Sequence, residues 1–135
     1  MKSISKLKKE LDKWFSLFIR LRDADTHGNV VCFTCGTTKH YKSGMQCGHF
    51  QSRRHMATRF DETNCQPQCV KCNMFEQGEQ FKFHIKLNAK YGEDTSINLQ
   101  HKAMQSVKFT RVDYNEKISY YKSAVDNLKK QKGIE

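Results

Sequence analysis

Apolar side chains recur every three or four positions near the start of the chain, and lysines fill most of the positions between them. This i, i+3, i+4 spacing places the apolar side chains on one face of a helix. The pattern predicts an amphipathic helix over residues 3–22, whose apolar face packs on the rest of the protein. The apolar positions are Ile4, Leu7, Leu11, Trp14, Phe15, Phe18 and Ile19.

Two more helices are predicted after residue 79. Residues 80–92 are ambiguous, because four apolar side chains alternate there as they would in a strand. The length of the segment and its closing Gly92 favour a helix, and a short helix is predicted over residues 95–105. The alternating side chains are Phe81, Phe83, Ile85 and Leu87.

The last part of the chain has a clean apolar stripe at helical spacing. Asp113 with Glu116 resembles the start of a capping box, and Gly133 follows the stripe as a helix terminator. A final helix is therefore predicted from about Asp113 to Gly133. The stripe consists of Ile118, Tyr121, Val125 and Leu128.

The middle of the chain holds all six cysteines and has no helical period. The segment VVCFTCG, residues 30–36, is typical of a short strand that enters a zinc knuckle, where glycine permits the tight turn. Ser43 and Gly44 predict the turn of a β-hairpin over residues 40–51. That hairpin places His49 at or just after the end of its second strand.

The length of 135 residues suits one domain, 1–135. We expect an N-terminal helix (3–22), a cysteine-rich core (25–78) and a helical C-terminal part (79–133). No run of 18 apolar residues exists, so no membrane span is expected. The charged N-terminus has no apolar signal core, which favours a cytoplasmic protein.

The formal charge of +10 is unevenly distributed. Residues 26–60 contain no aspartate or glutamate at all. Such a stretch around a cysteine-rich segment favours a polyanionic partner, above all nucleic acid, over a merely soluble surface. The basic residues in it are Lys39, Lys42, Arg53, Arg54 and Arg59.

The six cysteines indicate either disulfides or a metal site. Two Cys-x-x-Cys pairs without a secretory signal favour metal, because each pair can bind one side of a tetrahedral Zn²⁺ ion. The expected structural zinc ligands are Cys32, Cys35, Cys69 and Cys72, with 33 residues between the pairs.

One alternative for the zinc site stays open. Cys47 and His49 can join Cys32 and Cys35 in a local site of three cysteines and one histidine. His49 would then be a structural ligand, and the second Cys-x-x-Cys pair would lack a purpose unless it formed another site with Cys65.

Three polar residues follow one another in the order typical of HNH, or ββα-metal, nucleases. His49 ends the predicted hairpin, Asn64 follows 15 residues later, and Asn73 stands directly after the second Cys-x-x-Cys pair. Phosphodiester hydrolysis requires a base that deprotonates water and a cation at the scissile phosphate. A histidine fixed near a divalent ion supplies the base, and an asparagine or histidine at the start of the following helix helps to hold the ion. A lone histidine would more simply be structural.

Several segments resemble the phage NinG/Rap recombination family over roughly residues 14–92. The resemblance implies an α+β fold with a zinc-stapled ββα-metal (HNH-like) core, flanked by N-terminal and C-terminal helices. It also implies binding or cutting of branched DNA, such as Holliday junctions, inside a bacterial host. It rests on IRLRDAD (19–25), CFTCG (32–36), GHF (48–50), TRFD (58–61), Asn64, QCVKCN (68–73) and Gly78.

Position by position, the resemblance makes His49 the general base and Asn73 a ligand of a catalytic Mg²⁺ or Mn²⁺ ion. Asn64 is the middle asparagine, which is expected to hold the loop and orient the histidine. The chain departs from the fullest HNH pattern at Gly48, where an acidic metal ligand often precedes the histidine. Asp61 is the nearest carboxylate and the candidate second ligand, with an ion pair to Arg59 or a role as a turn residue as its alternatives.

The expected activity is metal-dependent cleavage of branched DNA. Arg53, Arg54 and Arg59, together with Lys39 and Lys42, are expected to contact phosphates, which give affinity without sequence readout. Two rivals are a non-catalytic zinc module that binds branched DNA and a sequence-selective homing or defence nuclease. Phage or host recombination proteins are candidate partners, and the apolar N-terminal face is a candidate homodimer seam.

Overall fold

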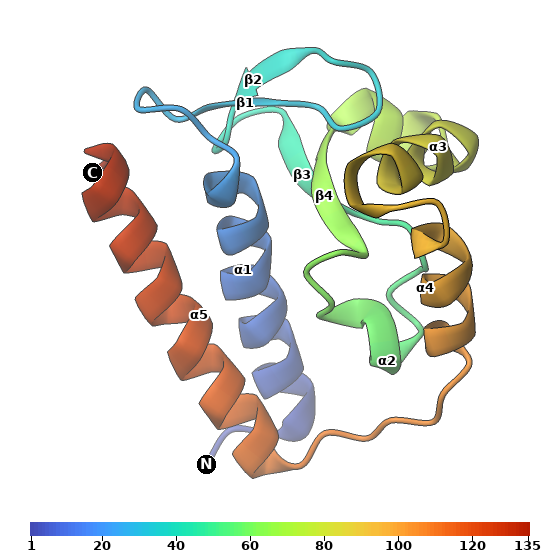
Figure 1. Ribbon diagram of the computed structural model, residues 1–135. Helices are drawn as coiled ribbons and strands as arrows, with labels where there is room; N and C mark the ends of the chain where they lie inside the picture. The colour runs from blue at the N-terminus through green and yellow to red at the C-terminus, as the bar shows by residue number, and fades with distance from the viewer.

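Two long helices form one flank of the molecule. In the computed structural model, which describes residues 1–135, α1 (Ile4–Arg22) and α5 (Arg111–Lys132) lie side by side (Figure 1). They run in the same direction, because Arg111 donates to the Lys2 carbonyl at one end and Lys132 donates to the Ala24 carbonyl at the other. The N-terminus therefore lies near the start of α5 and the C-terminus near the end of α1.

The predicted apolar face of α1 is confirmed. Leu7, Leu11, Phe15 and Ile19 are buried, whereas the first position of the pattern, Ile4, remains exposed. The Phe15 ring meets the Tyr121 ring of α5 edge to face, with centroids 5.1 Å apart. Aromatic contact and apolar burial therefore hold the two helices together.

The final helix begins earlier than predicted. Thr110 is its N-cap: the Thr110 hydroxyl accepts a hydrogen bond from the Asp113 N–H, and the Asp113 carboxylate accepts one from the Thr110 N–H. Asp113 is thus the third helical residue of a true capping box. The predicted pairing of Asp113 with Glu116 is wrong, but the predicted end at Gly133 is confirmed by its left-handed backbone.

Two small antiparallel sheets lie beside α1. β1 (Asn29–Val31) pairs with β2 (Thr38–His40), and β3 (Met45–His49) pairs with β4 (Cys65–Cys69), so that His49 lies opposite Cys65. The observed architecture confirms the α+β class.

The predicted hairpin over residues 40–51 is wrong. Gly44 does adopt the positive φ of a turn, +83°, but the strands on either side of it belong to different sheets. All five residues of β4 are buried, whereas β2 is mostly exposed. β3 therefore buries more surface against the distant strand, and this burial outweighs the local turn preference.

The remaining elements cover the other side of the β3–β4 sheet (Figure 1). They are α2 (Met56–Arg59), the π-helical turn η1 (Lys71–Phe75), α3 (Gln80–Tyr91) and α4 (Thr95–Ala103). The helix predicted for residues 80–92 is confirmed, because Phe83 and Leu87 are buried together while Phe81 and Ile85 are exposed. The helix predicted at 95–105 is confirmed too.

Three clusters of buried apolar side chains hold these elements together. One joins α1 to α5, one joins both sheets to the ends of those helices, and one joins α3 to α4. None of the helices combines the length and apolar character needed to cross a bilayer. The proposed domain boundaries stay a prediction.

Candidate functional site

Four cysteine sulfurs converge where β1 and β4 end. The Sγ atoms of Cys32, Cys35, Cys69 and Cys72 all lie within 4.8 Å of one another, and those of Cys35 and Cys69 are 3.7 Å apart. A tetrahedral zinc ion with Zn–S bonds of about 2.3 Å requires sulfurs about 3.8 Å apart. The donor set and its spacing therefore fit a metal ion such as zinc.

The electrostatics of this cluster also favour a cation. Burial raises the pKa of the Cys32 thiol, but N–H groups of Cys69 and Cys35 that donate to its sulfur outweigh burial and bring the pKa from 9.0 down to about 6. Burial and the neighbouring thiols raise the pKa of Cys72 to about 12. Four thiolates repel one another at this range, so a divalent ion is what allows all of them to ionise.

The alternative local site is wrong. Cys47 and His49 do not join Cys32 and Cys35; they form a separate group with Cys65. All six cysteines are free thiols. His49 is therefore not a ligand of the four-cysteine cluster.

His49 is the last residue of β3, and its ring is fixed by the loop that follows. Its Nε2 lies 3.0 Å from the Arg59 carbonyl oxygen. Because a carbonyl oxygen only accepts, Nε2 must carry the hydrogen, which leaves Nδ1 of the neutral ring with a free lone pair. Burial lowers the pKa of His49 from 6.5, although the Arg59 carbonyl opposes that shift. A neutral imidazole with a free Nδ1 is the form that a general base requires.

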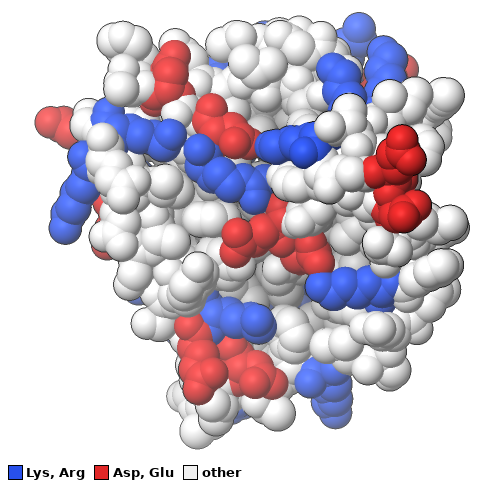
Figure 2. Space-filling model, in the orientation of Figure 1, with Lys and Arg blue, Asp and Glu red and all other residues white.

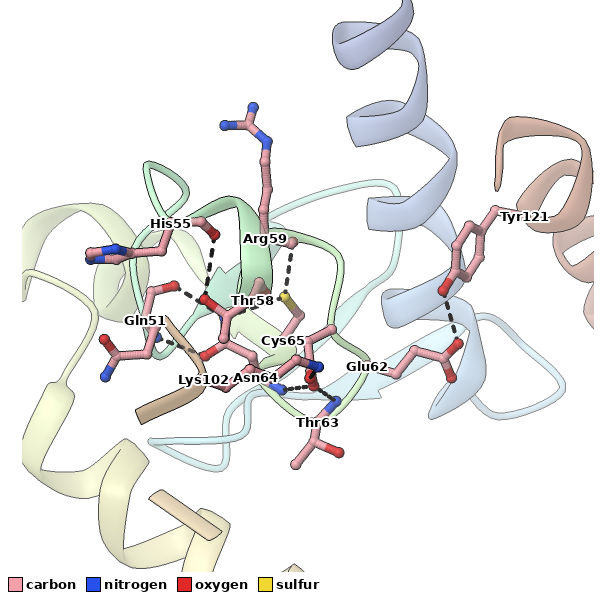
Figure 3. A network of polar contacts seen from close by, with 11 residues as sticks. Gln51, His55, Thr58, Arg59, Glu62, Thr63, Asn64, Cys65, Lys102 and Tyr121 are labelled. Carbon is pink, nitrogen blue, oxygen red and sulfur yellow. Dashed lines mark hydrogen bonds and ion pairs between the residues drawn. The ribbon is translucent and has the colours of Figure 1, made fainter. Parts of the chain in front are cut away.

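Asn64 holds the loop that carries this carbonyl (Figure 3). Its Oδ1 accepts from the Gln51 N–H at 2.7 Å, and its Nδ2 donates to the carbonyls of Gln51 and Thr58 at 3.0 and 3.1 Å. The side chain is fully buried. Asn64 therefore cannot touch a substrate directly, and it holds the loop that orients His49, as expected for the middle asparagine.

A cavity of about 710 Å³ opens beside His49. Asn73 lines it as predicted, and its Nδ2 donates to Gln46 Oε1 at 2.7 Å, which leaves the Asn73 Oδ1 available as an oxygen ligand. The polar side chains around the cavity include Asp12, Gln46, His49, Arg53, Asn73 and Gln77.

Asp61 does not line this cavity. One carboxylate oxygen accepts the N–H groups of Thr63 and Asn64, and the other accepts from Lys102. The structure assigns Asp61 the expected turn role, because its carboxylate closes the turn before β4. It does not place Asp61 at the cavity as a second ligand of a catalytic ion, and Arg59 is not the partner of Asp61.

Arg59 is paired with Asp12, a residue that the sequence did not single out. Arg59 Nε and Nη2 lie 3.0 and 2.5 Å from the two carboxylate oxygens of Asp12, and Nη1 donates to the Arg53 carbonyl. With its side chain only 15% exposed, Arg59 is committed to protein partners. Its predicted phosphate contact is therefore corrected to a bridge between α1 and α2.

The other four predicted phosphate contacts remain accessible. Arg53, Arg54, Lys39 and Lys42 are exposed, and Arg53 also lines the cavity. On the face that Figure 2 shows, Lys and Arg side chains are interspersed with Asp and Glu and form no continuous basic patch. The acid-free stretch of sequence thus does not give an uninterrupted basic surface on this side.

Gly48 has no room for the acid found there in the fullest HNH pattern. A Cβ at this position would lie 2.0 Å from Gln68 Oε1. Gln68 is fully buried and cannot swing away freely, because its Nε2 donates to the Thr34 hydroxyl and the Gly78 carbonyl. The Gln68 amide therefore occupies the space that a side chain at position 48 would need.

Gly48→Ala is expected to destabilise the protein by about 1–3 kcal/mol, the usual cost of overpacking a core. In a Gln68→Ala background the same substitution should cost clearly less, because the clashing amide is gone. Urea denaturation of the parent, both single variants and the double variant measures this coupling. Additive free energies of unfolding would contradict the steric explanation.

Comparison with known proteins identifies relatives of this chain. A model of the family described as bacteriophage lambda NinG protein matches residues 1–132. The chain is 25% identical to protein ninG of Escherichia phage lambda over 82% of its own length and 54% of the relative. It is 27% identical to protein ninG of Salmonella phage P22 over 82% and 55%, and 30% identical to that of Escherichia phage 933W over 64% and 40%.

The chain thus spans about half the length of these relatives. No solved structure matches it. The family model nevertheless covers almost all of the chain, from residue 1, just before α1, to the end of α5. The chain therefore belongs to the family of the bacteriophage lambda NinG protein.

Proposed function

We propose that the protein is a metal-dependent DNA endonuclease of the HNH, or ββα-metal, type. The observation that carries the proposal is the neutral His49, whose Nδ1 lone pair is free beside a cavity that Asn73 also lines. The order of β3, β4 and the helical turn η1 supports it, since this is a ββα sequence with His49 and Asn73 on its strand and helix.

In the proposed reaction, His49 Nδ1 takes a proton from a water molecule that attacks the scissile phosphorus. The Arg59 carbonyl keeps the hydrogen on Nε2 and stabilises the imidazolium that forms. Arg53 at the edge of the cavity positions the phosphate backbone of the DNA. The phosphodiester is then expected to break to a 5′-phosphate and a 3′-hydroxyl.

The cavity offers oxygen donors that suit a hard cation. Asn73 Oδ1 is the ligand that we propose for Mg²⁺ or Mn²⁺, with water and the substrate phosphate completing the coordination, as is usual for Mg²⁺. When bound, the ion would supply charge stabilisation at the phosphate and the leaving oxygen. Asp12 lines the cavity as well, but Arg59 already holds both of its oxygens.

Branched DNA is the substrate that we propose, in phage recombination within the host cytoplasm. The accessible basic side chains, Arg53, Arg54, Lys39 and Lys42, suit phosphate contacts, which position a duplex without reading its sequence. Recognition of branched DNA by its shape requires only such phosphate contacts. Other recombination proteins are its proposed partners.

A second candidate function is a zinc-containing module that binds branched DNA without cutting it. Gly48 supplies no carboxylate, and the Asp12 carboxylate is committed to Arg59. These two observations favour that alternative, because they leave the cavity without a free carboxylate for a catalytic ion.

Cleavage of a labelled four-way junction decides between the two functions. Zinc-loaded protein is incubated with the junction or a matched linear duplex, in Mg²⁺, Mn²⁺ or EDTA. Metal-dependent cutting of the junction supports the nuclease. Tight binding without cutting in either metal supports the binding module, and cutting of the linear duplex at one sequence supports a sequence-selective nuclease.

The pH dependence of cutting should reflect the buried His49. The neutral ring is the active form, and protonation at low pH removes its lone pair. Because burial lowers the His49 pKa from 6.5, the neutral form persists to lower pH, and the acid limb of the rate profile is expected below pH 6.5. Single-turnover rates over a pH series measure it. An acid limb above that value, with junction binding unchanged, would contradict the assignment.

A further inference from the structure

A second group of metal-binding side chains lies where the β3–β4 sheet faces α1. Cys47 and His49 are two residues apart on β3 and so point to the same face, and Cys65 begins β4 directly opposite His49. One ligand atom from each of the three lies within 4.8 Å of the others. The four-cysteine cluster uses none of them.

The donor types suit a borderline-soft ion. Two thiolates and one imidazole are ligands that Zn²⁺ and Cd²⁺ prefer, while Mg²⁺ prefers oxygen. Bonds of about 2.0–2.3 Å to nitrogen and sulfur bring tetrahedral donors within roughly 4 Å of each other, so only small side-chain shifts are needed. Three protein ligands leave a fourth position open, and Cys47 and His49 both line the cavity through which an ion can enter.

A cation and an amide lie close to the two sulfurs. The half-buried Arg20 guanidinium lies close enough to Cys47 to interact with it electrostatically. Asn64 Nδ2 lies 3.9 Å from Cys65 Sγ. Burial raises the pKa of Cys65 well above its ordinary value, so this side chain is a protonated thiol until an ion binds.

We propose that Cys47, His49 and Cys65 form a second metal site for Zn²⁺ or a similar soft divalent ion. Binding forms two metal–sulfur bonds and one metal–nitrogen bond, and it releases the two thiol protons to solvent. No oxidant or reductant takes part.

This site shares the imidazole of the proposed general base. An ion bound at Nδ1 occupies the lone pair directly. An ion bound at Nε2 requires the neutral ring to carry its hydrogen on Nδ1, which removes that lone pair as well. Zinc at the second site therefore prevents His49 from acting as a general base. This inhibition rests on the proposed function, whereas the binding of metal at the site does not rest on it.

Metal stoichiometry tests the site without any measurement of cutting. Reduced protein with zinc in its four-cysteine cluster is dialysed against excess Zn²⁺ or Co²⁺, and bound metal is counted per chain. The parent is expected to bind a second equivalent and, with Co²⁺, to show thiolate-to-metal charge-transfer absorption. Cys47→Ser is expected to bind one equivalent only. Ser16→Ala, which changes another small side chain at the cavity wall, should still bind two.

A parent that binds one equivalent, or a Cys47→Ser variant that binds two with unchanged absorption, would overturn the proposal. Cys47 is half-buried, so its serine variant should fold, and Cys65→Ala serves as a second test of the same ligand set. If the protein cuts DNA, zinc beyond the first equivalent should slow the parent. The cleavage rate of each variant with added zinc is compared with the rate of the same variant without it. If zinc slows Cys47→Ser as much as it slows the parent, the second site has no inhibitory role.

Discussion

Substituting His49 with alanine is expected to reduce the rate of junction cleavage by about 10²–10⁴-fold, the range that a positioned general base contributes. The side chain lines the cavity with its Nδ1 lone pair free, because Nε2 donates to the Arg59 carbonyl. Alanine removes the proton acceptor but leaves the four-cysteine cluster, Asn73 and the exposed arginines in place. The single-turnover cleavage rate of the zinc-loaded protein measures the effect.

The control for this prediction is a neighbouring histidine. His55 precedes α2, and its side chain makes no capping hydrogen bond, so His55→Ala should retain most of the cleavage activity. Both variants must keep the zinc of the four-cysteine cluster and the junction affinity of the parent. Equal cleavage by the parent and His49→Ala would remove His49 as the base.

The helices follow from the sequence because their signals are local. Apolar spacing within α1 and the closing glycine of α3 depend only on nearby residues, and both helices form where predicted. The spacing within each Cys-x-x-Cys pair lets its two sulfurs bind the same ion. The cluster of four sulfurs could therefore be predicted without knowledge of the fold. The order of His49, Asn64 and Asn73 along the sequence likewise predicted two residues that line the cavity and one that holds the supporting loop.

The features that the sequence did not give depend on contacts between distant segments. The pairing of β3 with β4 rather than β2 depends on the burial of β4, which no local turn signal contains. Asp12 lies among the polar residues of α1 and becomes part of the cavity only because Arg59 reaches it across 46 intervening residues. The space missing at Gly48 is likewise set by Gln68 from the neighbouring strand.

Asp61 illustrates why proximity in sequence is a weak guide to a metal ligand. It stands three residues before Asn64, yet its carboxylate accepts the N–H groups of the turn and pairs with Lys102. A short polar side chain before a strand readily forms such a turn. The carboxylate that lies beside His49 comes instead from α1, and it is neutralised by an arginine.

Removal of zinc from the four-cysteine cluster is expected to unfold the protein rather than merely weaken it. A structural zinc site contributes on the order of 10 kcal/mol of apparent folding free energy, comparable to the roughly 5–15 kcal/mol of a whole domain. Cys32, Cys69 and Cys72 also belong to the apolar cluster that contains Leu21 of α1 and Val125 of α5. Loss of the ion therefore acts on the helical flank as well as on the sheets.

Thermal unfolding followed by circular dichroism, with and without a strong zinc chelator, measures this effect. Cys69→Ser should reproduce the chelated state, because one ligand is lost and three thiols are left crowded without a cation. Cys47→Ser is the matched control: it replaces a cysteine outside the cluster and should keep the first zinc equivalent and a cooperative transition. A chelated protein that loses its zinc and still melts at the parent temperature would mean that burial alone holds the two Cys-x-x-Cys segments together.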